Sequence, residues 1–295
     1  MKSGEPSATA RLIAAATIYS SIRTDQSALV PKEAATWCER LLAASPGGRR
    51  WLKSVRSPVD RAFFSLIEKF TLPGITRHYQ LRKRWIERAW KQALDLGFRQ
   101  LLVLGAGLDT LTLREAERDP TLRLVEVDHP ATQTVKQQAF QLHGLTGRVR
   151  LVPADLSLTS LAEALAGNLE LDKPMFVVAE GLLMYLDESR VRALMRAVAE
   201  LPVPRVQFAM THMDGPAGFT PHSRLVDLWL RFRSEPFRWS ASDAEVRAML
   251  EQCGWRVMRQ VRGEEIAREL GLSEARELKG ENIALAEKSA NELKS

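Results

Sequence analysis

Apolar positions in the first 96 residues recur every three to four residues, the spacing of helices that bury one face. One apolar stripe comprises Val30, Ala34, Trp37, Cys38, Leu41 and Leu42, and a second comprises Phe63, Phe64, Ile67 and Phe70. The turn residues Pro46-Gly47-Gly48 interrupt the pattern, and a long helix is expected over 75–96. The pattern predicts an N-terminal helical cap over residues 1–96.

From residue 97 the pattern changes to short apolar runs that alternate with amphipathic segments. Strands are expected over 100–104, 122–127, 148–152, 175–179, 205–210, 255–261 and 282–286. A helix is expected over 157–166, and Ser242 with Glu245 forms a capping box that begins another. Strands that alternate with helices indicate a doubly wound, mostly parallel α/β sheet, with the last two strands as an antiparallel edge.

Residues 211–239 interrupt this alternation with prolines, a glycine and an amphipathic run. We interpret the segment as an inserted lid within a core that spans 97–295. Its aromatic residues could close over an apolar ligand or pack the insert onto the sheet; they are Trp229, Phe232 and Phe237.

Glycines and acids follow the predicted parallel strands, at the edge where open α/β sheets bind ligands. Gly105 and Gly107 allow a tight turn and a close approach of the backbone to a ligand. Asp128 can accept hydrogen bonds from both hydroxyls of a ribose. Asp155 and the amide of Leu156 can pair with an adenine. Together these residues predict an adenosine pocket.

The glycine turn distinguishes between adenosine cofactors. Dinucleotide sites use a third glycine and aim a helix N-terminus at the pyrophosphate. Here Thr110 takes the third position, and Asp109 would repel a diphosphate. Asp109 is compatible with the cationic sulfonium and amino group of S-adenosylmethionine. The sequence favours this cofactor over a nicotinamide dinucleotide; the simplest alternative is a set of loop turns with solvated acids.

Four ordered motifs resemble the leucine carboxyl methyltransferase family, closest to its bacterial branch of O-methyltransferases associated with polyketide metabolism. They are GFRQLLVLGAGLDT (97–110), EVDHP (126–130), ADL (154–156) and AEGLLMYL (179–186). The resemblance covers roughly residues 73–210 and implies a seven-stranded class I methyltransferase fold, a helical cap and S-adenosylmethionine as cofactor. Many bacterial members have an arginine where this chain has Leu111, although Arg114 is kept, so the acceptor side differs.

The resemblance also implies roles for individual residues. By this resemblance, Arg82 would bind the methionine carboxylate of the cofactor, Gly105 would line its methionine moiety, and Glu180 would lie near its amino group. Asp128 would hold the ribose, and Asp155 and Leu156 would hold the adenine. Tyr185 would border the acceptor site.

The acceptor decides whether a base is needed. A carboxylate is already ionised at neutral pH, whereas an alcohol or phenol must lose a proton. His212, at the end of the fifth predicted strand, is the best-placed candidate base, ahead of His129 and His222. We expect O-methylation of a carboxylate or acidic hydroxyl on a small molecule or peptide, without a metal, and with Tyr185 and His212 as candidate catalytic residues.

Positive charge gives the main alternative. The net charge is +6, and residues 77–91 carry Arg77, Arg82, Lys83, Arg84, Arg88 and Lys91 against Glu87. A non-catalytic protein of the same fold could bind nucleic acid or a partner through this basic helix. However, the helix is amphipathic and the aromatic content is only 7%. We therefore interpret the run as a solvated face with one or two arginines turned inward.

Compartment and membrane association follow from composition. No apolar run reaches the ~18 residues that a spanning helix needs. The two cysteines, Cys38 and Cys253, lie among apolar residues and outside metal-binding spacings. We expect them to be free core thiols in a cytosolic protein.

Overall fold

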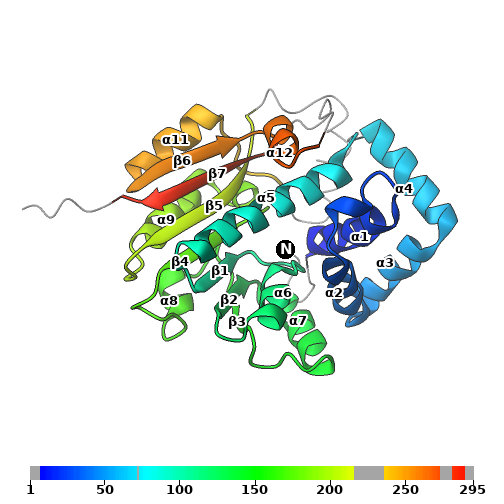
Figure 1. Cartoon of the computed structure of the whole chain (residues 1–295), viewed down its shortest axis with the longest axis horizontal. Helices are drawn as coiled ribbons and strands as arrows, with labels where there is room; N and C mark the ends of the chain where they lie inside the picture. The colour runs from blue at the N-terminus through cyan, green and yellow to red at the C-terminus, as the bar shows by residue number, and fades with distance from the viewer. Residues whose placement is uncertain (1–6, 72, 216–235, 273–280, 290–295) are drawn as a thin grey trace, which may run out of the picture.

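At the centre of this computed structural model, which describes residues 7–71, 73–215, 236–272 and 281–289, lies a seven-stranded sheet of order β3-β2-β1-β4-β5-β7-β6 (Figure 1). The strands are β1 (Gln100–Leu104), β2 (Arg123–Asp128), β3 (Arg150–Pro153), β4 (Met175–Ala179), β5 (Val206–Met213), β6 (Trp255–Val261) and β7 (Glu281–Lys288). Strands β1 to β5 pair in parallel, and β7 is antiparallel to both of its neighbours. The predicted mostly parallel sheet is confirmed.

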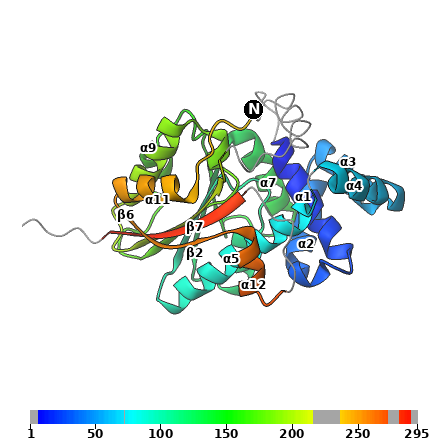
Figure 2. The same ribbon diagram turned by 90° about the horizontal axis from the view of Figure 1, so that it is seen from above.

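Helices cover both faces of the sheet, as expected for a doubly wound fold. One face carries α5 (Ile75–Asp95), α6 (Leu111–Arg118), α7 (Pro130–Leu142) and α12 (Gly263–Glu269); the other carries α8 (Leu161–Leu165), α9 (Glu188–Ala199) and α11 (Asp243–Gln252). Successive strand residues divide between the two layers, because side chains alternate along a strand. Leu101 joins the first layer and Leu102 the second. Figure 2 shows α9 and α11 on the opposite side of the sheet from α5 and α12.

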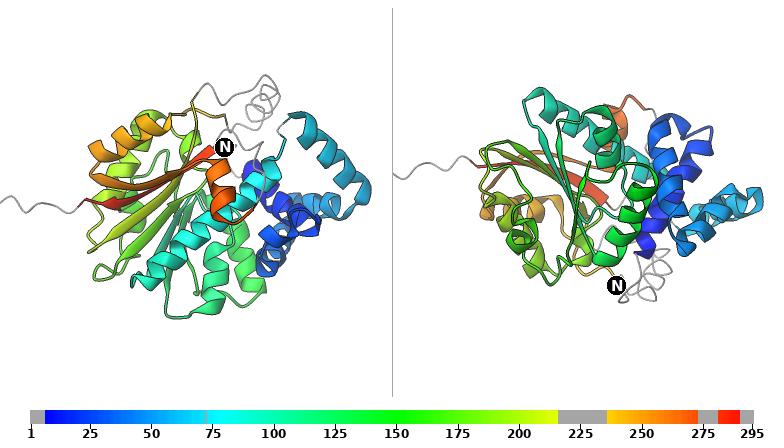
Figure 3. Two further views of the ribbon diagram at one scale, coloured as in Figure 1. Left: turned by 45° about the horizontal axis from the view of Figure 1, so that its top comes forward. Right: turned by 90° about the horizontal axis from the view of Figure 1, so that it is seen from below.

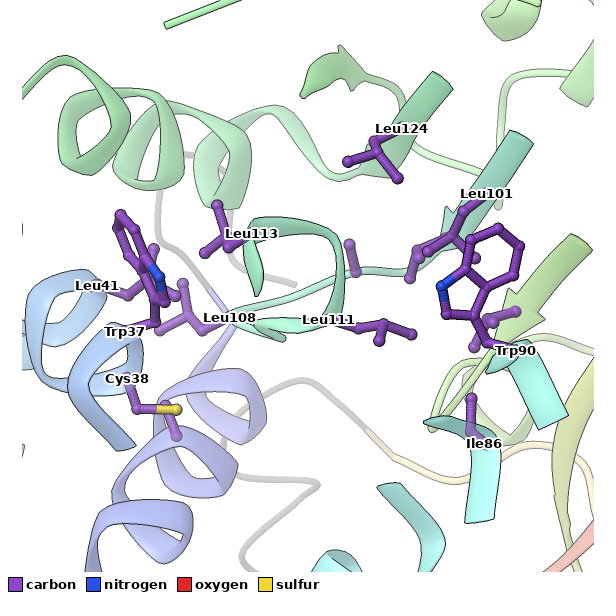
Figure 4. Packing of buried hydrophobic residues seen from close by; sticks show 14 of the residues in the cluster. Trp37, Cys38, Leu41, Ile86, Trp90, Leu101, Leu108, Leu111, Leu113 and Leu124 are labelled. Atoms are coloured by element: carbon purple, nitrogen blue, oxygen red, sulfur yellow. The ribbon is translucent and has the colours of Figure 1, made fainter. Parts of the chain in front are cut away.

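The N-terminal helices lie beside the sheet in every view (Figure 3). They are α1 (Ala8–Ile22), the 3₁₀ turn η1 (Ser27–Leu29), α2 (Lys32–Ala43), α3 (Pro46–Arg56) and α4 (Pro58–Thr71). Trp37 and Leu41 of α2 point toward Leu108 and Leu113 and share one hydrophobic cluster with them (Figure 4). This packing is continuous between cap and core, and the proposed division at residue 96 stays a prediction.

Pro46-Gly47-Gly48 interrupts the apolar pattern as predicted, since α2 ends at Ala43 and the three residues begin α3, where Ser45 caps the Gly48 amide at 3.1 Å. Two other local predictions were wrong. The helix expected over 157–166 is reduced to α8, because Asp155 and Ser160 stabilise a turn before it. Residues 211–213 continue β5 and do not begin a lid. Residues 216–235, with Trp229, Phe232 and His222, lie outside the described residues.

The second apolar stripe lies on α4 but does not join the core. No residue of α4 is buried, and Phe63 and Phe70 are 61% and 64% exposed. Among the described residues, Phe64 has an aromatic neighbour, since its ring stacks on Trp51 with centroids 6.1 Å apart. The periodicity therefore predicted the helix correctly but not its surroundings.

Within the described ranges, no helix is both long and apolar enough to cross a bilayer.

Candidate functional site

A cavity of about 280 Å³ lies between the carboxyl ends of the parallel strands and the N-terminal helices. Its wall brings together most of the predicted site residues, namely Arg82, Gly105, Gly107, Asp109, Asp128, Asp155, Leu156, Glu180 and Tyr185. His212 does not line it. The position agrees with the rule that open α/β sheets bind ligands beyond the carboxyl ends of their strands.

The glycine turn after β1 leaves room for a ligand because side chains are absent there. Gly105 and Gly107 have φ angles of +65° and +52°, which favour glycine. A Cβ on Gly105 would lie 2.8 Å from Leu182, and one on Gly107 would lie 3.2 Å from Ala10 of α1. A side chain at Gly105 would therefore push against Leu182, and one at Gly107 would push against helix α1.

Asp128 ends β2 and holds the turn in place. Its Oδ2 accepts a hydrogen bond from the Gly107 amide at 2.5 Å, and its Oδ1 accepts one from the His129 amide at 2.6 Å. Burial raises the pKa of Asp128, although these two bonds oppose the shift. Each carboxylate oxygen can accept two hydrogen bonds. Both oxygens of Asp128 can therefore also accept from a pair of ligand hydroxyls.

The loop after β3 forms the next part of the wall. Asp155 accepts hydrogen bonds at its Oδ1 from the amide and hydroxyl of Ser157, at 2.9 and 2.6 Å. Burial would raise the pKa of Asp155, but these bonds outweigh it and lower the pKa. The carboxylate is therefore ionised at neutral pH and can accept from an amine of a ligand.

A buried ion cluster forms the end of the cavity wall between α5 and β4. Arg82 is only 2% exposed, and its Nε and Nη2 lie 2.8 and 2.7 Å from Glu180 Oε1. Its Nη1 donates to Glu281. Lys83 contacts Asp109 and lies 3.1 Å from Glu180 Oε1. Two cations therefore face three carboxylates, which leaves the cluster with one excess negative charge.

The pKa values follow from these contacts. Burial would raise the pKa of Asp109, but Lys83 outweighs it and holds the pKa far below its usual value. Burial would lower the pKa of Arg82, but Glu281 and Glu180 outweigh it and raise the pKa. Asp109 and Arg82 are therefore both charged at neutral pH.

Lys83 and Glu281 were not predicted as site residues. Lys83 was visible only as one of several cations in a basic run. Glu281 reaches the site because β7 inserts between β5 and β6, which places Glu281 opposite Met213 at the carboxyl end of β5. Behind Glu281, His78 Nε2 lies 3.5 Å from its Oε2. Strand order is a property of the assembled sheet, so no local pattern in the sequence could have indicated this carboxylate.

We expect Glu281→Gln to destabilise the protein in a pH-dependent way. Burial would raise the pKa of Glu281, but Arg82 outweighs it and lowers the pKa to about 2, against 4.5 ordinarily. The carboxylate therefore contributes stability that is fully present above pH 4.5 and is lost as the pH falls toward 2. Glu281→Gln should lower the melting temperature by a few degrees at neutral pH. Thermal melts should show this difference shrinking at acid pH, and a constant difference would contradict the assignment.

His212 is fully buried on the other side of β5. Its Nδ1 lies 3.0 Å from the Ala241 carbonyl oxygen, and its Nε2 lies 3.4 Å from Asp243 at the start of α11. Neighbouring Thr211 points toward the cavity side and accepts a hydrogen bond from the Gly181 amide at 2.9 Å. Side chains alternate along a strand, so one residue faces the site and the next faces α11. A catalytic role for His212 stays a prediction.

Tyr185 lies in the 3₁₀ turn η2 (Leu183–Tyr185) that follows β4. Its ring contacts Phe237, with centroids 5.5 Å apart. Arg238, the residue after Phe237, donates its amide to the Met184 carbonyl oxygen at 2.7 Å. Tyr185 and Arg238 both line the cavity, so η2 and the segment that contains Phe237 and Arg238 form a second side of the site.

The basic run 77–91 is divided between the interior and ion pairs. Arg82 and Lys83 point inward, Arg84 pairs with Glu87 at 3.2 Å, and Arg88 donates to the Glu269 carbonyl oxygen at 2.8 Å. Arg82, Lys83 and Arg84 are paired with carboxylates, so the run does not present a continuous row of free cations to phosphates. The nucleic-acid alternative is not favoured.

Comparisons with known proteins agree with this geometry. Residues 23–199 match the sequence profile of the leucine carboxyl methyltransferase family. A Frankia alni protein assigned as an S-adenosyl-L-methionine-dependent methyltransferase is 38% identical over 133 residues, 44% of this chain and 47% of that protein. A Mycolicibacterium gilvum protein with the same assignment is 29% identical over 202 residues, 64% of each chain. The alignments thus span less than two thirds of these relatives.

A solved structure shows the shared fold. It is a DUF574 family protein from Streptomyces avermitilis, which superposes with a TM-score of 0.61 at 20% sequence identity. The superposition covers 85% of this chain and 97% of that chain.

Proposed function

This chain belongs to the leucine carboxyl methyltransferase family, and from that premise we propose that it is an S-adenosylmethionine-dependent O-methyltransferase. The proposed acceptor is a carboxylate or an acidic hydroxyl of a small molecule or peptide. One observation carries the proposal: Asp128, Asp155 and the Arg82–Glu180 pair line one cavity at the carboxyl ends of four neighbouring strands.

The residues present fit S-adenosylmethionine. Gly105 and Gly107 leave the space that a Cβ would fill, and Asp128 retains an accepting position on each oxygen for the ribose hydroxyls. The excess negative charge of the ion cluster complements a cofactor whose sulfonium and amino group outweigh its carboxylate. Asp155 and Leu156 would hold the adenine.

Arg82 can bind a carboxylate without leaving its partners. An arginine side chain has five N–H donors. Glu180 takes Nε and one donor of Nη2, and Glu281 takes one donor of Nη1. One donor on each Nη remains, and an arginine can bind a carboxylate through two such donors. Arg82 would thus hold the methionine carboxylate, with Glu180 near the amino group.

The cavity wall favours an acceptor that is already ionised. When bound, S-adenosylmethionine supplies a methyl group on a sulfonium, which an ionised oxygen can take without losing a proton. Among the described residues of the wall, the one histidine is His129, and its Nδ1 accepts a hydrogen bond from the Ala131 amide at 3.2 Å. His129 therefore caps α7. The role of the chain is to align the reactants and exclude water.

A labelling experiment tests the proposed reaction. The purified chain is incubated with S-adenosylmethionine labelled in its methyl group and a panel of carboxylic acids and matched phenols. Methyl esters release labelled methanol in mild alkali, whereas methyl ethers keep the label. We expect alkali-labile label on an acid. Tight cofactor binding with label only in stable linkages would overturn the carboxylate preference.

We expect His212→Asn to keep methyl transfer to an acid within about twofold of the wild type, because an ionised acceptor needs no base. The measurement is kcat with the acid identified above, together with the affinity for S-adenosylmethionine. If turnover is lost while cofactor affinity is unchanged, His212 is catalytic and the prediction is wrong.

The biological setting is a separate part of the proposal. A cytosolic location and an association with polyketide metabolism stay predictions.

A further inference from the structure

Exposed apolar side chains gather on one side of α4. Five large residues there are each at least 41% exposed, and their spacing along the helix places them on one face. We call this surface the outer face of α4; it comprises Val59, Phe63, Leu66, Ile67 and Phe70. Figures 1 and 2 show α3 and α4 at the edge of the molecule, on the far side of α1 and α2 from the sheet. The outer face is therefore open to solvent.

The opposite side of α4 is polar and attaches the helix to the protein. Glu68 accepts hydrogen bonds from the Thr76 amide and hydroxyl, at 3.1 and 2.7 Å, and lies 3.4 Å from Arg23. A helix that packs on a core normally buries its apolar face. In α4 this polarity is reversed, and a contiguous apolar surface of this kind marks an interaction site.

Helices α3 and α4 also carry most of the positive charge of the chain. Residues 46–71 hold six cations and two carboxylates, which gives them a charge of +4 out of a net charge of +6. The cations are Arg49, Arg50, Lys53, Arg56, Arg61 and Lys69. Arg49 and Arg61 donate to backbone carbonyl oxygens at 3.0 and 3.1 Å, which neutralises neither charge. The outer face thus belongs to a helix whose neighbour, α3, has four cations and no acid.

Charge decides between a second copy of the chain and an anionic surface. Two copies that met through their outer faces would bring two positively charged helix pairs together, and like charges repel. An anionic bilayer offers both complements at once, because its phosphates attract cations and the boundary between headgroups and acyl chains accepts apolar side chains. A bilayer also needs no groove that matches a helix at the edge of the molecule.

We propose that the outer face of α4 and the cations of α3 form a surface that docks onto anionic lipid bilayers. Phe63 and Phe70 would enter the headgroup region, and the exposed Arg50 and Lys53 would contact lipid phosphates. The contact would be peripheral, since no helix of the described ranges can cross a bilayer. Residues of α3 and α4, all of which the structure describes, do not line the cavity, so this surface is separate from the proposed site of methyl transfer.

Cosedimentation of the full chain with lipid vesicles tests the proposal. One set of vesicles contains phosphatidylcholine and phosphatidylglycerol in equal parts, and the other contains phosphatidylcholine alone. We expect the chain to bind the anionic vesicles roughly tenfold or more tightly than the neutral ones. High salt should weaken this binding, because it screens the cations. Absence of binding to the anionic vesicles, or equal binding to both sets, would overturn the proposal.

A double variant tests the apolar contact. Phe63→Ser with Phe70→Ser should weaken binding to the anionic vesicles roughly tenfold or more. The matched control is Leu142→Ser with Leu171→Ser, which removes two leucines that are 73% and 57% exposed outside α4 and should change nothing. All four side chains are exposed, so both variants should fold, and thermal melts check this. Wild-type binding in the phenylalanine variant would contradict the assignment of the outer face.

A second pair of variants tests the charge. Arg50→Gln with Lys53→Gln should weaken binding to the anionic vesicles roughly tenfold or more and reduce its dependence on salt. Arg190→Gln with Arg196→Gln removes the same charge from exposed positions of α9 and should leave binding close to that of the wild type. An equal loss in both variants would mean that the net charge of the chain drives binding, and the surface would be assigned wrongly.

Sedimentation velocity without lipid tests the remaining occupant, a second copy of the chain. We expect Phe63→Ser with Phe70→Ser to leave the oligomeric state unchanged. If this variant dissociates a dimer, the outer face is an interface between two copies and the bilayer proposal is wrong. None of these measurements uses S-adenosylmethionine, so their outcome is independent of the proposed function.

Discussion

Asp128→Ala is expected to raise the dissociation constant for S-adenosylmethionine about 100-fold or more. A hydrogen bond to a charged acceptor contributes about 1.5–3 kcal/mol, and Asp128 would accept two from the ribose. The same carboxylate also fixes the Gly107 and His129 amides at 2.5 and 2.6 Å, so its removal loosens the turn that faces the cofactor. Isothermal titration calorimetry measures the loss.

Two companion variants make this result interpretable. Asp128→Asn keeps the size of the side chain and one accepting oxygen, so its affinity should lie between those of the wild type and Asp128→Ala. Asp119→Ala removes a partly exposed acid, outside the cavity wall, that accepts from the Thr121 amide at 2.8 Å, and it should leave binding unchanged. Wild-type affinity in Asp128→Ala would show that the ribose is held elsewhere.

Arg82→Lys is the second change with a large expected effect. Lysine keeps the charge but cannot contact Glu180, Glu281 and a ligand carboxylate in one plane. We expect the dissociation constant for S-adenosylmethionine to rise about 100-fold. The melting temperature should also fall, because the buried Glu281 and the mostly buried Glu180 lose well-placed donors. Calorimetry and thermal melts measure the two effects separately.

A second ligand shows whether the loss comes from the carboxylate contact. 5′-Methylthioadenosine keeps the adenosine but lacks the amino-acid part, so Arg82→Lys should bind it as the wild type does. Arg88→Lys makes the same substitution at an exposed position of α5 and should leave both ligands unaffected. An equal loss for both ligands in Arg82→Lys would mean that the whole pocket has collapsed.

Helix α5 contributes several residues to the cavity wall. Arg82 and Lys83 pair with Glu180 at one place, and Glu87 pairs with Arg114 of α6 at another. The same helix packs on α1 and α12. A change in the cap that shifts α5 would therefore move several residues of the cavity wall together.

The sequence by itself determined the sheet and the cofactor half of the site. Parallel strands end at one edge, so residues that follow successive strands are brought together by the topology alone. This is why Asp128, Asp155 and Glu180 could be placed in one pocket. Helix starts that depend on neighbouring residues could also be predicted from the sequence, as in the capping box of Ser242 and Glu245 that begins α11.

Only the tertiary structure decided what each of these residues meets. Glu281 faces Arg82 because β7 inserts beside β5, and His212 faces α11 because strand side chains alternate. The apolar stripe on α4 is largely exposed, because α3 contacts it through Trp51 on Phe64 while Phe63 and Phe70 stay at the surface. Periodicity and capping depend on neighbours within a few residues of the chain. Strand order, burial and ion pairing depend on segments far apart in sequence, and their positions are set by the packing of the whole molecule.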